Sequence, residues 1–272
     1  MIRLVTDSNS QLPAVLRETY SVDVVPLTVT VDGQGYLEGE EIDLAGITAA
    51  LERQATVGTS TPAPGQFLQA YERAAAQGAS AIVSVHAGGG ASGTANSARI
   101  AAAMAPVPVE VVDTGTASFP VSLCLWAAAE VLTGGGSTSA AAQAARDTAA
   151  VVDNVFIVGA LGLAARGGRL APGLETAGVP VLALTSGTMQ AIGEVTDVEA
   201  AVEAMIERVA SQTDGKRVRA GVGHLAAAGL ADLLEAGLRQ RVDLEQLVRY
   251  DVGPSVAVHV GLGTVGCVFY PL

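Results

Sequence analysis

The first half of the chain alternates short apolar segments with amphipathic ones, and this alternation restricts the possible folds more than any other feature. The segment SAIVSVH at 80–86 is an almost unbroken apolar run, typical of a strand covered on both faces of a sheet. Helical periodicity is present on either side of it, over 65–78 and 97–105. Further strands are predicted at 2–7 and 109–113. The alternation predicts a parallel sheet wrapped by helices.

The pattern changes near Val152, where strands become separated by longer stretches and 179–195 has the pattern of a hairpin. This favours a second α/β unit with a mixed or antiparallel sheet. We therefore predict two α/β domains, an N-terminal one over 1–152 and a C-terminal one over 153–272.

Two local features are predicted in the second half of the chain. A helix is predicted over 197–212, with Thr196 and Glu199 forming a capping box at its start. The segment AVHVGLG is predicted to run from a strand into a loop, which places His259 near a strand end.

Composition excludes several functions. The net charge is -12 and no basic run is present, which argues against binding to nucleic acid. No apolar run is long enough for stable membrane insertion. Lys216 is the only lysine and lies in a predicted turn, and Cys124 and Cys267 are too few for a disulfide scaffold or a zinc site. Two reduced thiols fit a cytoplasmic protein, and no metal or catalytic motif is found.

The turn after 80–86 contains a G-x-G-x-x-G pattern formed by Gly88, Gly90 and Gly93. A predicted strand precedes it, a predicted helix follows, and Asp113 lies 20 residues beyond Gly93. This is the spacing of a dinucleotide-binding turn with a ribose-binding acid. An NAD(P)-dependent oxidoreductase is therefore one hypothesis.

Three other interpretations of the same turn remain open. A serine-hydrolase elbow requires glycine where Thr94 stands. A purely structural turn would make Ser92 an ordinary helix N-cap. An anion site would use the hydroxyls of Ser92 and Thr94 at the helix N-terminus, together with a second hydroxyl-rich loop, GTSTPAP.

Seven segments, taken in order along nearly the whole chain, resemble the DegV family of bacterial fatty-acid-binding proteins. They are VTDSNSQL, PLTVTVDGQGYLEGEEID, TSTPAPGQF, HAGGGASGTANSA, VVDT, LGLAARGGRL and GPSVAVHVGLGTVG. The resemblance implies one long-chain fatty acid bound in an apolar tunnel between two α/β domains. It implies a non-catalytic carrier without a cofactor.

The resemblance also implies roles for individual residues. Thr59 and Ser92 would hold the fatty-acid carboxylate, and His259 would belong to the same hydrogen-bond network. The pocket vicinity would include Ser60, Gly93, Thr94 and Arg169. Burial of the acyl chain would contribute about 0.8 kcal/mol per methylene.

The family's carriers present the acid to a separate ATP-binding fatty-acid kinase, so such a kinase is an expected partner in phospholipid metabolism. The family's basic signature after the hairpin is replaced here by a segment containing Glu194 and Val195.

Among the remaining residues, His86 and His224 are predicted to be structural or on the surface. Asp7 and Ser8 end the first strand, where they either contribute to a site or cap the next helix.

Overall fold

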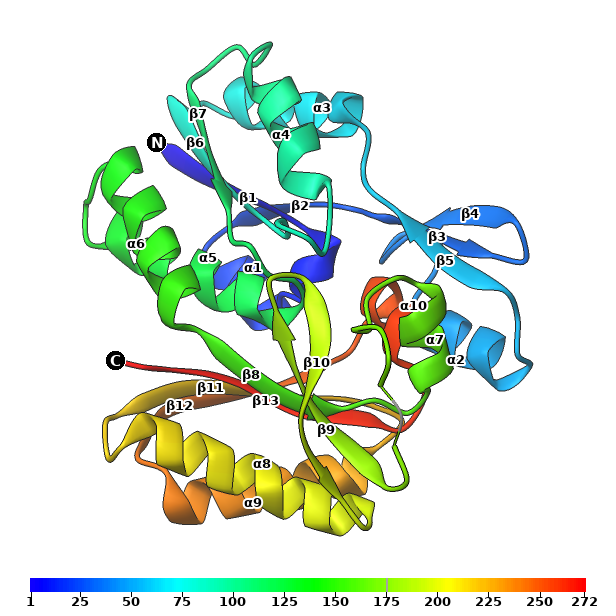
Figure 1. The fold of residues 1–272 in the computed structure, drawn as a ribbon. Helices are drawn as coiled ribbons and strands as arrows, with labels where there is room; N and C mark the ends of the chain where they lie inside the picture. Colours follow the sequence, from blue (N-terminus) through cyan, green and yellow to red (C-terminus); the bar gives the residue numbers. More distant parts are fainter. Residues whose placement is uncertain (175) are drawn as a thin grey trace.

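A computed structural model describes residues 1–174 and 176–272. Its first sheet is fully parallel, with the strand order β2-β1-β6-β7. The strands alternate with helices along the chain, which confirms the predicted parallel α/β arrangement (Figure 1). The strand bounds are β1 (Ile2–Asp7), β2 (Val22–Val25), β6 (Ala81–His86) and β7 (Val109–Asp113).

Helices cover both faces of this sheet, as the continuous apolar run of β6 predicts. On one face Val85 packs in a cluster with Leu125 of α5 and Ala142 of α6. On the other face Ile82 packs with Phe67 of α3 and Ala98 of α4. The helices of this part are η1 (Ser8–Ser10), α1 (Ala14–Thr19), α3 (Pro64–Ala76), α4 (Thr94–Ala102), α5 (Phe119–Thr133) and α6 (Thr138–Val151).

A small antiparallel sheet, ordered β4-β3-β5, is inserted between β2 and α3. Its elements are β3 (Thr28–Val31), β4 (Gln34–Leu37), α2 (Leu44–Glu52) and β5 (Val57–Ser60). The prediction that the TSTPAP segment is entirely loop is wrong at its start, because Thr59 pairs with Val29 in this sheet. The strand pairing ends at Ser60, two residues before Pro62.

The larger sheet has six strands in the order β10-β9-β8-β13-β11-β12. Only β11 and β12 pair in parallel, so the sheet is mixed, as predicted. The strands are β8 (Asp153–Ile157), β9 (Val179–Thr185), β10 (Thr188–Val195), β11 (Val218–Leu225), β12 (Leu244–Asp251) and β13 (Thr264–Pro271).

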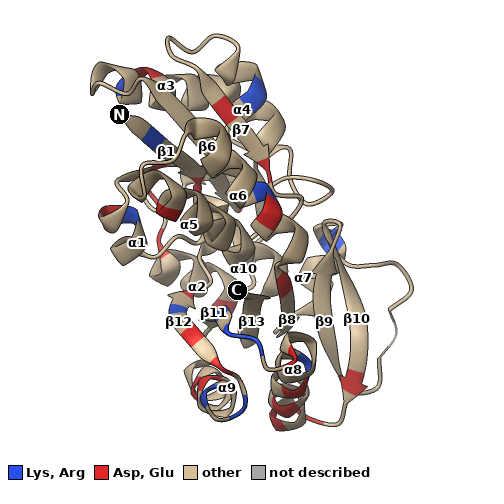
Figure 2. Ribbon diagram, turned by 90° about the vertical axis from the view of Figure 1, so that its left-hand side faces the viewer, with Lys and Arg blue, Asp and Glu red and all other residues tan. Residues whose placement is uncertain are grey.

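Two helices, α8 (Val198–Thr213) and α9 (Ala228–Arg241), cover one face of the six-stranded sheet. Their outer surfaces carry charges of both signs (Figure 2). The predicted capping box is wrong, because Asp197 is the N-cap and accepts a hydrogen bond from the Ala200 N–H. An aspartate one position closer to the helix competes successfully with Thr196, whose hydroxyl donates to the same carboxylate.

The opposite face of the larger sheet carries two short helices, α7 (Leu161–Arg166) and α10 (Pro254–Val260). His259 therefore lies in a helix, and the prediction of a strand-to-loop position is wrong. Pro254 starts this helix with its fixed φ, and Gly261, at a φ of +75°, ends it. The small sheet packs here too, since Val29 and Ile47 share a core cluster with Val258.

The parallel sheet is formed entirely within 1–152 and the six-stranded sheet within 153–272. The cluster of Val29, Ile47 and Val258 crosses that division, and a boundary at residue 152 stays a prediction.

A buried cation connects the two sheets' layers. Arg219 of β11 lies with its guanidinium carbon 4.3 Å from the ring centre of Trp126 on α5. The same guanidinium donates to Glu130 at 2.7 and 3.1 Å and to the Tyr270 hydroxyl at 3.0 Å. Trp126 in turn donates its Nε1–H to the Tyr20 hydroxyl. This arrangement fixes α5 against the larger sheet.

Candidate ligand-binding site

A cavity lies where the loops of the parallel sheet face β8, β11, β13 and α10. Its volume is about 180 Å³. The lining residues are Asn9, Leu27, Thr59, Ser60, Thr61, Ala91, Ser92, Gly93, Ala117, Ser118, Pro120, Asn154, Phe156, Arg169, Leu184, Met189, Gly223, Tyr250, Val252, Ser255, Val256, His259, Val260, Thr264, Gly266, Cys267 and Val268.

The lining has a distinct charge pattern. Among the lining residues that the structure describes, Arg169 is the one with a formal charge, and none is an aspartate or glutamate. This is notable in a chain with a net charge of -12. An apolar cavity with a few hydroxyls and a single cation suits an amphipathic anion better than a cation.

Thr59 and His259 meet in this cavity from distant parts of the chain. The Thr59 Oγ1 atom of β5 lies 3.2 Å from the His259 Nε2 atom of α10. Burial, followed by the positive charge of Arg169, lowers the pKa of His259 to about 4. The imidazole is therefore neutral at pH 7. Within the described residues its Nδ1 atom has no hydrogen-bond partner.

Arg169 follows α7 after a turn in which Gly168 adopts a φ of +67°. Its guanidinium donates to the Gly167 carbonyl at 3.2 Å, and it has no ion-pair partner within 4.0 Å among the described residues. The Gly167 backbone is also close to His259, because a Cβ built on Gly167 would lie 2.5 Å from the His259 Nδ1 atom. The turn that carries Arg169 thus packs directly against the imidazole of His259.

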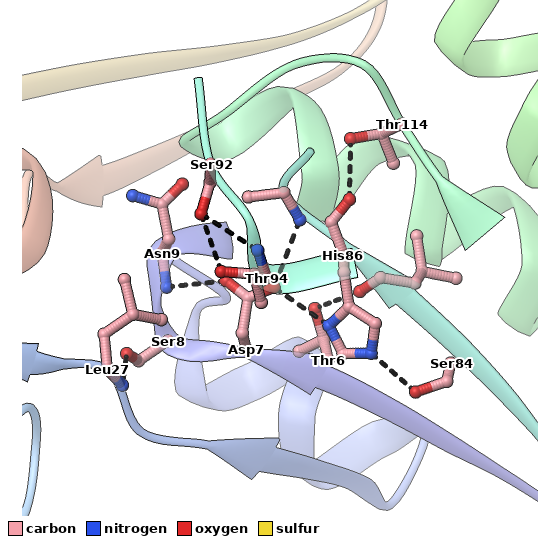
Figure 3. Close-up of polar contacts among 12 residues, drawn as sticks. Thr6, Asp7, Ser8, Asn9, Leu27, Ser84, His86, Ser92, Thr94 and Thr114 are labelled. Atoms are coloured by element: carbon pink, nitrogen blue, oxygen red, sulfur yellow. Dashed lines mark hydrogen bonds and ion pairs between the residues drawn. The ribbon is translucent and has the colours of Figure 1, made fainter. Parts of the chain in front are cut away.

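Ser92 lines the cavity from the turn between β6 and α4. Its Oγ atom lies 2.7 Å from the Thr94 Oγ1 atom and accepts from the Thr94 N–H at 3.3 Å (Figure 3). The N-cap of α4 is Gly93, which makes no side-chain capping bond. Ser92 is therefore not an ordinary N-cap, and its hydroxyl is held at the cavity wall by a buried threonine.

The glycines of this turn make room for other parts of the chain. A Cβ on Gly88 would lie 1.8 Å from the Asp113 Oδ1 atom, and a Cβ on Gly90 would lie 2.6 Å from the Ser186 carbonyl oxygen. Gly90 thus permits the tip of the β9–β10 hairpin to reach the turn. The close approach of the hairpin backbone explains why position 90 is a glycine.

Asp113 is occupied within the turn. Its Oδ1 atom accepts from the N–H groups of Gly89 at 3.1 Å and Gly115 at 3.0 Å. Its Oδ2 atom is 3.3 Å from Arg99. A ribose-binding acid would instead direct its oxygens at a ligand, so this geometry does not support the dinucleotide hypothesis.

A buried network supports the turn from below. The Asp7 carboxylate accepts from the Asn9 N–H and the Ala87 N–H, and its Oδ2 atom lies 2.9 Å from the His86 Nδ1 atom. The network continues from His86 to the Ser84 hydroxyl (Figure 3). The Ser84 Oγ atom lies 2.9 Å from the Tyr71 hydroxyl. Asp7 caps the short η1 helix rather than α1, and His86 is fully buried. The ends of β1 and β6 are thereby fixed relative to each other.

The helix that carries His259 is fixed by Glu38. This buried carboxylate accepts from the Ser255 N–H at 2.8 Å and from the Ser8 hydroxyl at 2.5 Å. Burial raises the pKa of Glu38, while the hydrogen bonds from Ser255 and Ser8 act to lower it. Ser8 also accepts from the Leu27 N–H. The strand end containing Asp7 and Ser8 thus orders two neighbouring elements of the site.

The structure brings together most of the residues that the sequence indicated. Thr59, Ser60, Ser92, Gly93, Arg169 and His259 all line the cavity. Thr94 is not in the lining, although it bonds to Ser92. His224 is outside the cavity as well. Its pKa is lowered, mainly by burial. The predicted roles in binding a carboxylate stay predictions.

Sequence reasoning missed several lining residues. Asn9 accepts from the Ser118 N–H through its Oδ1 atom, and Ser118 adopts a φ of +65°, which is uncommon outside glycine. Tyr250 and Cys267 contribute from β12 and β13. Of these residues, only Asn9 could have been identified from the sequence, because it follows the carboxyl end of a predicted parallel strand, where open α/β sheets bind ligands.

No helix in residues 1–174 and 176–272 is long and apolar enough to cross a membrane. The same residues contain no cluster of three or more His, Cys, Asp or Glu side chains arranged to hold a metal ion.

Comparison with known proteins gives consistent matches over the full length. A family model described as an uncharacterised protein of the DegV family matches residues 1–272. A DegV domain-containing protein of Streptomyces coelicolor is 37% identical over 98% of this chain and 97% of its own length.

Solved structures agree with this. A DegV family protein from Thermus thermophilus, described as fatty-acid binding, superimposes with a TM-score of 0.92 and 33% identity, covering 100% of this chain and 99% of its own. Bacillus subtilis DegV superimposes with a TM-score of 0.89 at 23% identity over 100% of this chain and 99% of its own, and shares the fold.

Proposed function

The chain belongs to the DegV family, and from this premise we propose that it binds one long-chain fatty acid in the cavity described above. The observation that carries the proposal is the lining: apolar side chains, hydroxyls from Thr59 and Ser92, one cation, and no carboxylate among the described residues. The relative from Thermus thermophilus, described as fatty-acid binding, supports the same ligand class.

Thr59, Ser92 and His259 hold the carboxylate in this proposal. The imidazole is neutral, and in this proposal its one proton is on Nε2. The Nε2–H group then donates a hydrogen bond to the Thr59 Oγ1 atom, 3.2 Å away. The Thr59 hydroxyl proton is then free to point at the ligand. Ser92 donates in the same way when Thr94 supplies the proton of their shared hydrogen bond. Arg169 adds a favourable charge from the pocket's edge.

The apolar part of the lining receives the acyl chain. Phe156, Leu184, Met189 and Val268 supply this surface from β8, β9, β10 and β13. At about 0.8 kcal/mol per buried methylene, the chain contributes most of the gross affinity, and the polar groups fix its direction.

Native mass spectrometry of the purified protein, followed by solvent extraction, tests the proposal. We expect an added mass that matches a fatty acid and that is released on extraction. An empty protein that also fails to take up added long-chain fatty acid would refute it. An adduct of nucleotide mass would instead restore the oxidoreductase hypothesis.

We also propose that the protein is a non-catalytic, cytoplasmic carrier whose bound acid is presented to a separate ATP-binding kinase. Family resemblance is the support for this step. The segment after the hairpin lacks the family's basic signature, and Glu194 there accepts from the N–H groups of Ala177 and Gly178. A pull-down with the kinase subunit of the same organism tests it: stable binding is expected, and no binding by loaded protein would remove the kinase step.

A further inference from the structure

Tyr250 occupies a special position in the wall of the cavity. Among residues 1–174 and 176–272, it is the one residue that lines both the cavity and a separate depression on the outer surface. The outer depression is formed by the turn after β1, the β4 turn and the end of β12, and includes Ser8, Gln11, Glu38 and Arg249. Tyr250 is therefore the residue at which the two spaces adjoin.

Two glycines of β11 make room for aromatic rings at this position. Gly223 is paired with Tyr250 in the sheet, and a Cβ on Gly223 would lie 2.2 Å from the Tyr250 Cζ atom. A Cβ on Gly221 would lie 2.3 Å from the Phe119 ring. Gly221 and Gly223 are two residues apart, so they face the same side of the strand. The two aromatic rings thus lie flat across the backbone of β11.

The rings form one continuous block. Phe119 and Tyr250 stack with centroids 4.2 Å apart and an interplanar angle of 10°. Phe119 is fully buried at the start of α5, in a cluster that includes Val268. A stacked pair on a glycine surface is a rigid boundary, because neither ring can move toward the sheet or through its neighbour.

We propose that Tyr250 is the residue that limits the length of the acyl chain accepted by this protein. The inference rests on the proposed fatty-acid binding. The ring closes the route from the apolar cavity to the outer depression, so a chain that reaches it must stop or bend. Removal of the ring joins the two spaces and lets a longer chain extend toward the surface.

The test compares a series of saturated fatty acids of increasing length on the wild type, Tyr250→Ala and Tyr250→Phe. Dissociation constants are measured by equilibrium dialysis. Each buried methylene is expected to tighten binding about fourfold, equivalent to about 0.8 kcal/mol, until the chain reaches the boundary. In the wild type and Tyr250→Phe this gain should end at the same length. In Tyr250→Ala it should continue for longer members.

Two results would overturn the inference. One is a folded Tyr250→Ala protein whose gain ends at the wild-type length. The other is a uniform loss of affinity across the series, which would show that Tyr250 contributes packing alone. Tyr250→Leu, which keeps an apolar side chain on the sheet, should show a smaller shift and provides the test if Tyr250→Ala does not fold. A wild type that binds no member would refute the proposed function itself.

Discussion

Replacement of Ser92 by alanine is the sharpest test of the carboxylate site. In the proposed complex the Ser92 hydroxyl donates to the ligand while it accepts from Thr94, whose Oγ1 atom lies 2.7 Å away. A hydrogen bond to a charged group contributes about 1.5–3 kcal/mol, so Ser92→Ala should weaken fatty-acid binding about 10- to 150-fold.

Thr94 provides a second step in the same test. It is fully buried and lies outside the cavity lining, so it acts on the ligand only through Ser92. Thr94→Val should therefore cost about 0.5–1.5 kcal/mol in binding, the range for a hydrogen bond between neutral groups. In a protein that already carries Ser92→Ala, the same change should cost almost nothing in affinity.

The assay is isothermal titration calorimetry with one long-chain fatty acid, supported by circular dichroism to confirm folding. Ser60→Ala is the matched control, because Ser60 is an exposed serine of the same lining and should shift the binding free energy by less than about 0.5 kcal/mol. Wild-type affinity in Ser92→Ala would refute the reasoning. Additive losses for Ser92 and Thr94 would also refute the relay between them.

Three further predictions concern stability. Because burial lowers the pKa of His259 from 6.5 to about 4, the unfolded chain binds more protons between these pH values. The contribution of His259 to the free energy of unfolding is thus fully present above pH 6.5. It is lost as the pH falls toward 4, and the loss is at most about 3 kcal/mol. Between pH 6.5 and 4, the free energy of unfolding from urea titrations should fall less in His259→Gln than in the wild type. An equal fall with pH in both proteins would contradict this. Arg219→Ala should lower the free energy of unfolding by about 2–3 kcal/mol, because it removes the stacking on Trp126 and the ion pair with the half-exposed Glu130. Arg219→Lys should recover only part of it, and an unchanged urea midpoint for Arg219→Ala would count against the stacking argument. Gly90→Ala should destabilise by about 1–3 kcal/mol in thermal unfolding, since its Cβ would lie 2.6 Å from a backbone oxygen. Gly93→Ala is the control, with its nearest contact at an ordinary 3.7 Å, and equal losses in both variants would disprove the steric explanation.

The regular elements were predictable because their burial is periodic. The apolar run at 80–86 became β6, and the helix predicted over 197–212 became α8 at 198–213, with Val202, Met205 and Val209 buried. Val198, in the first turn of this helix, is 36% exposed.

The remaining errors arose where tertiary contacts decide local structure. The short helix α10 has no amphipathic period long enough to detect, and its N-terminus is fixed by Glu38, more than 200 residues away. Thr59 joined a strand because β3 offered a partner for it. Pairing between segments so distant in sequence leaves no local pattern.

The site was predicted through order of motifs rather than through any single residue. Thr59, Ser92 and His259 each have a common structural explanation when considered alone, and only the fold brings them to one cavity. Asn9 and Tyr250 were missed because their place in the wall depends on packing against Ser118 and Gly223.

The contact between Arg219 and Trp126 has a practical consequence for experiments in solution. Trp126 is the single tryptophan of the chain, so the intrinsic fluorescence excited at the red edge comes from this junction alone. The indole lies on α5, whose first turn lines the cavity, and the cation above it belongs to β11. Any motion that separates α5 from β11 on ligand entry would change the emission, so Trp126 fluorescence reports directly on whether this junction stays closed.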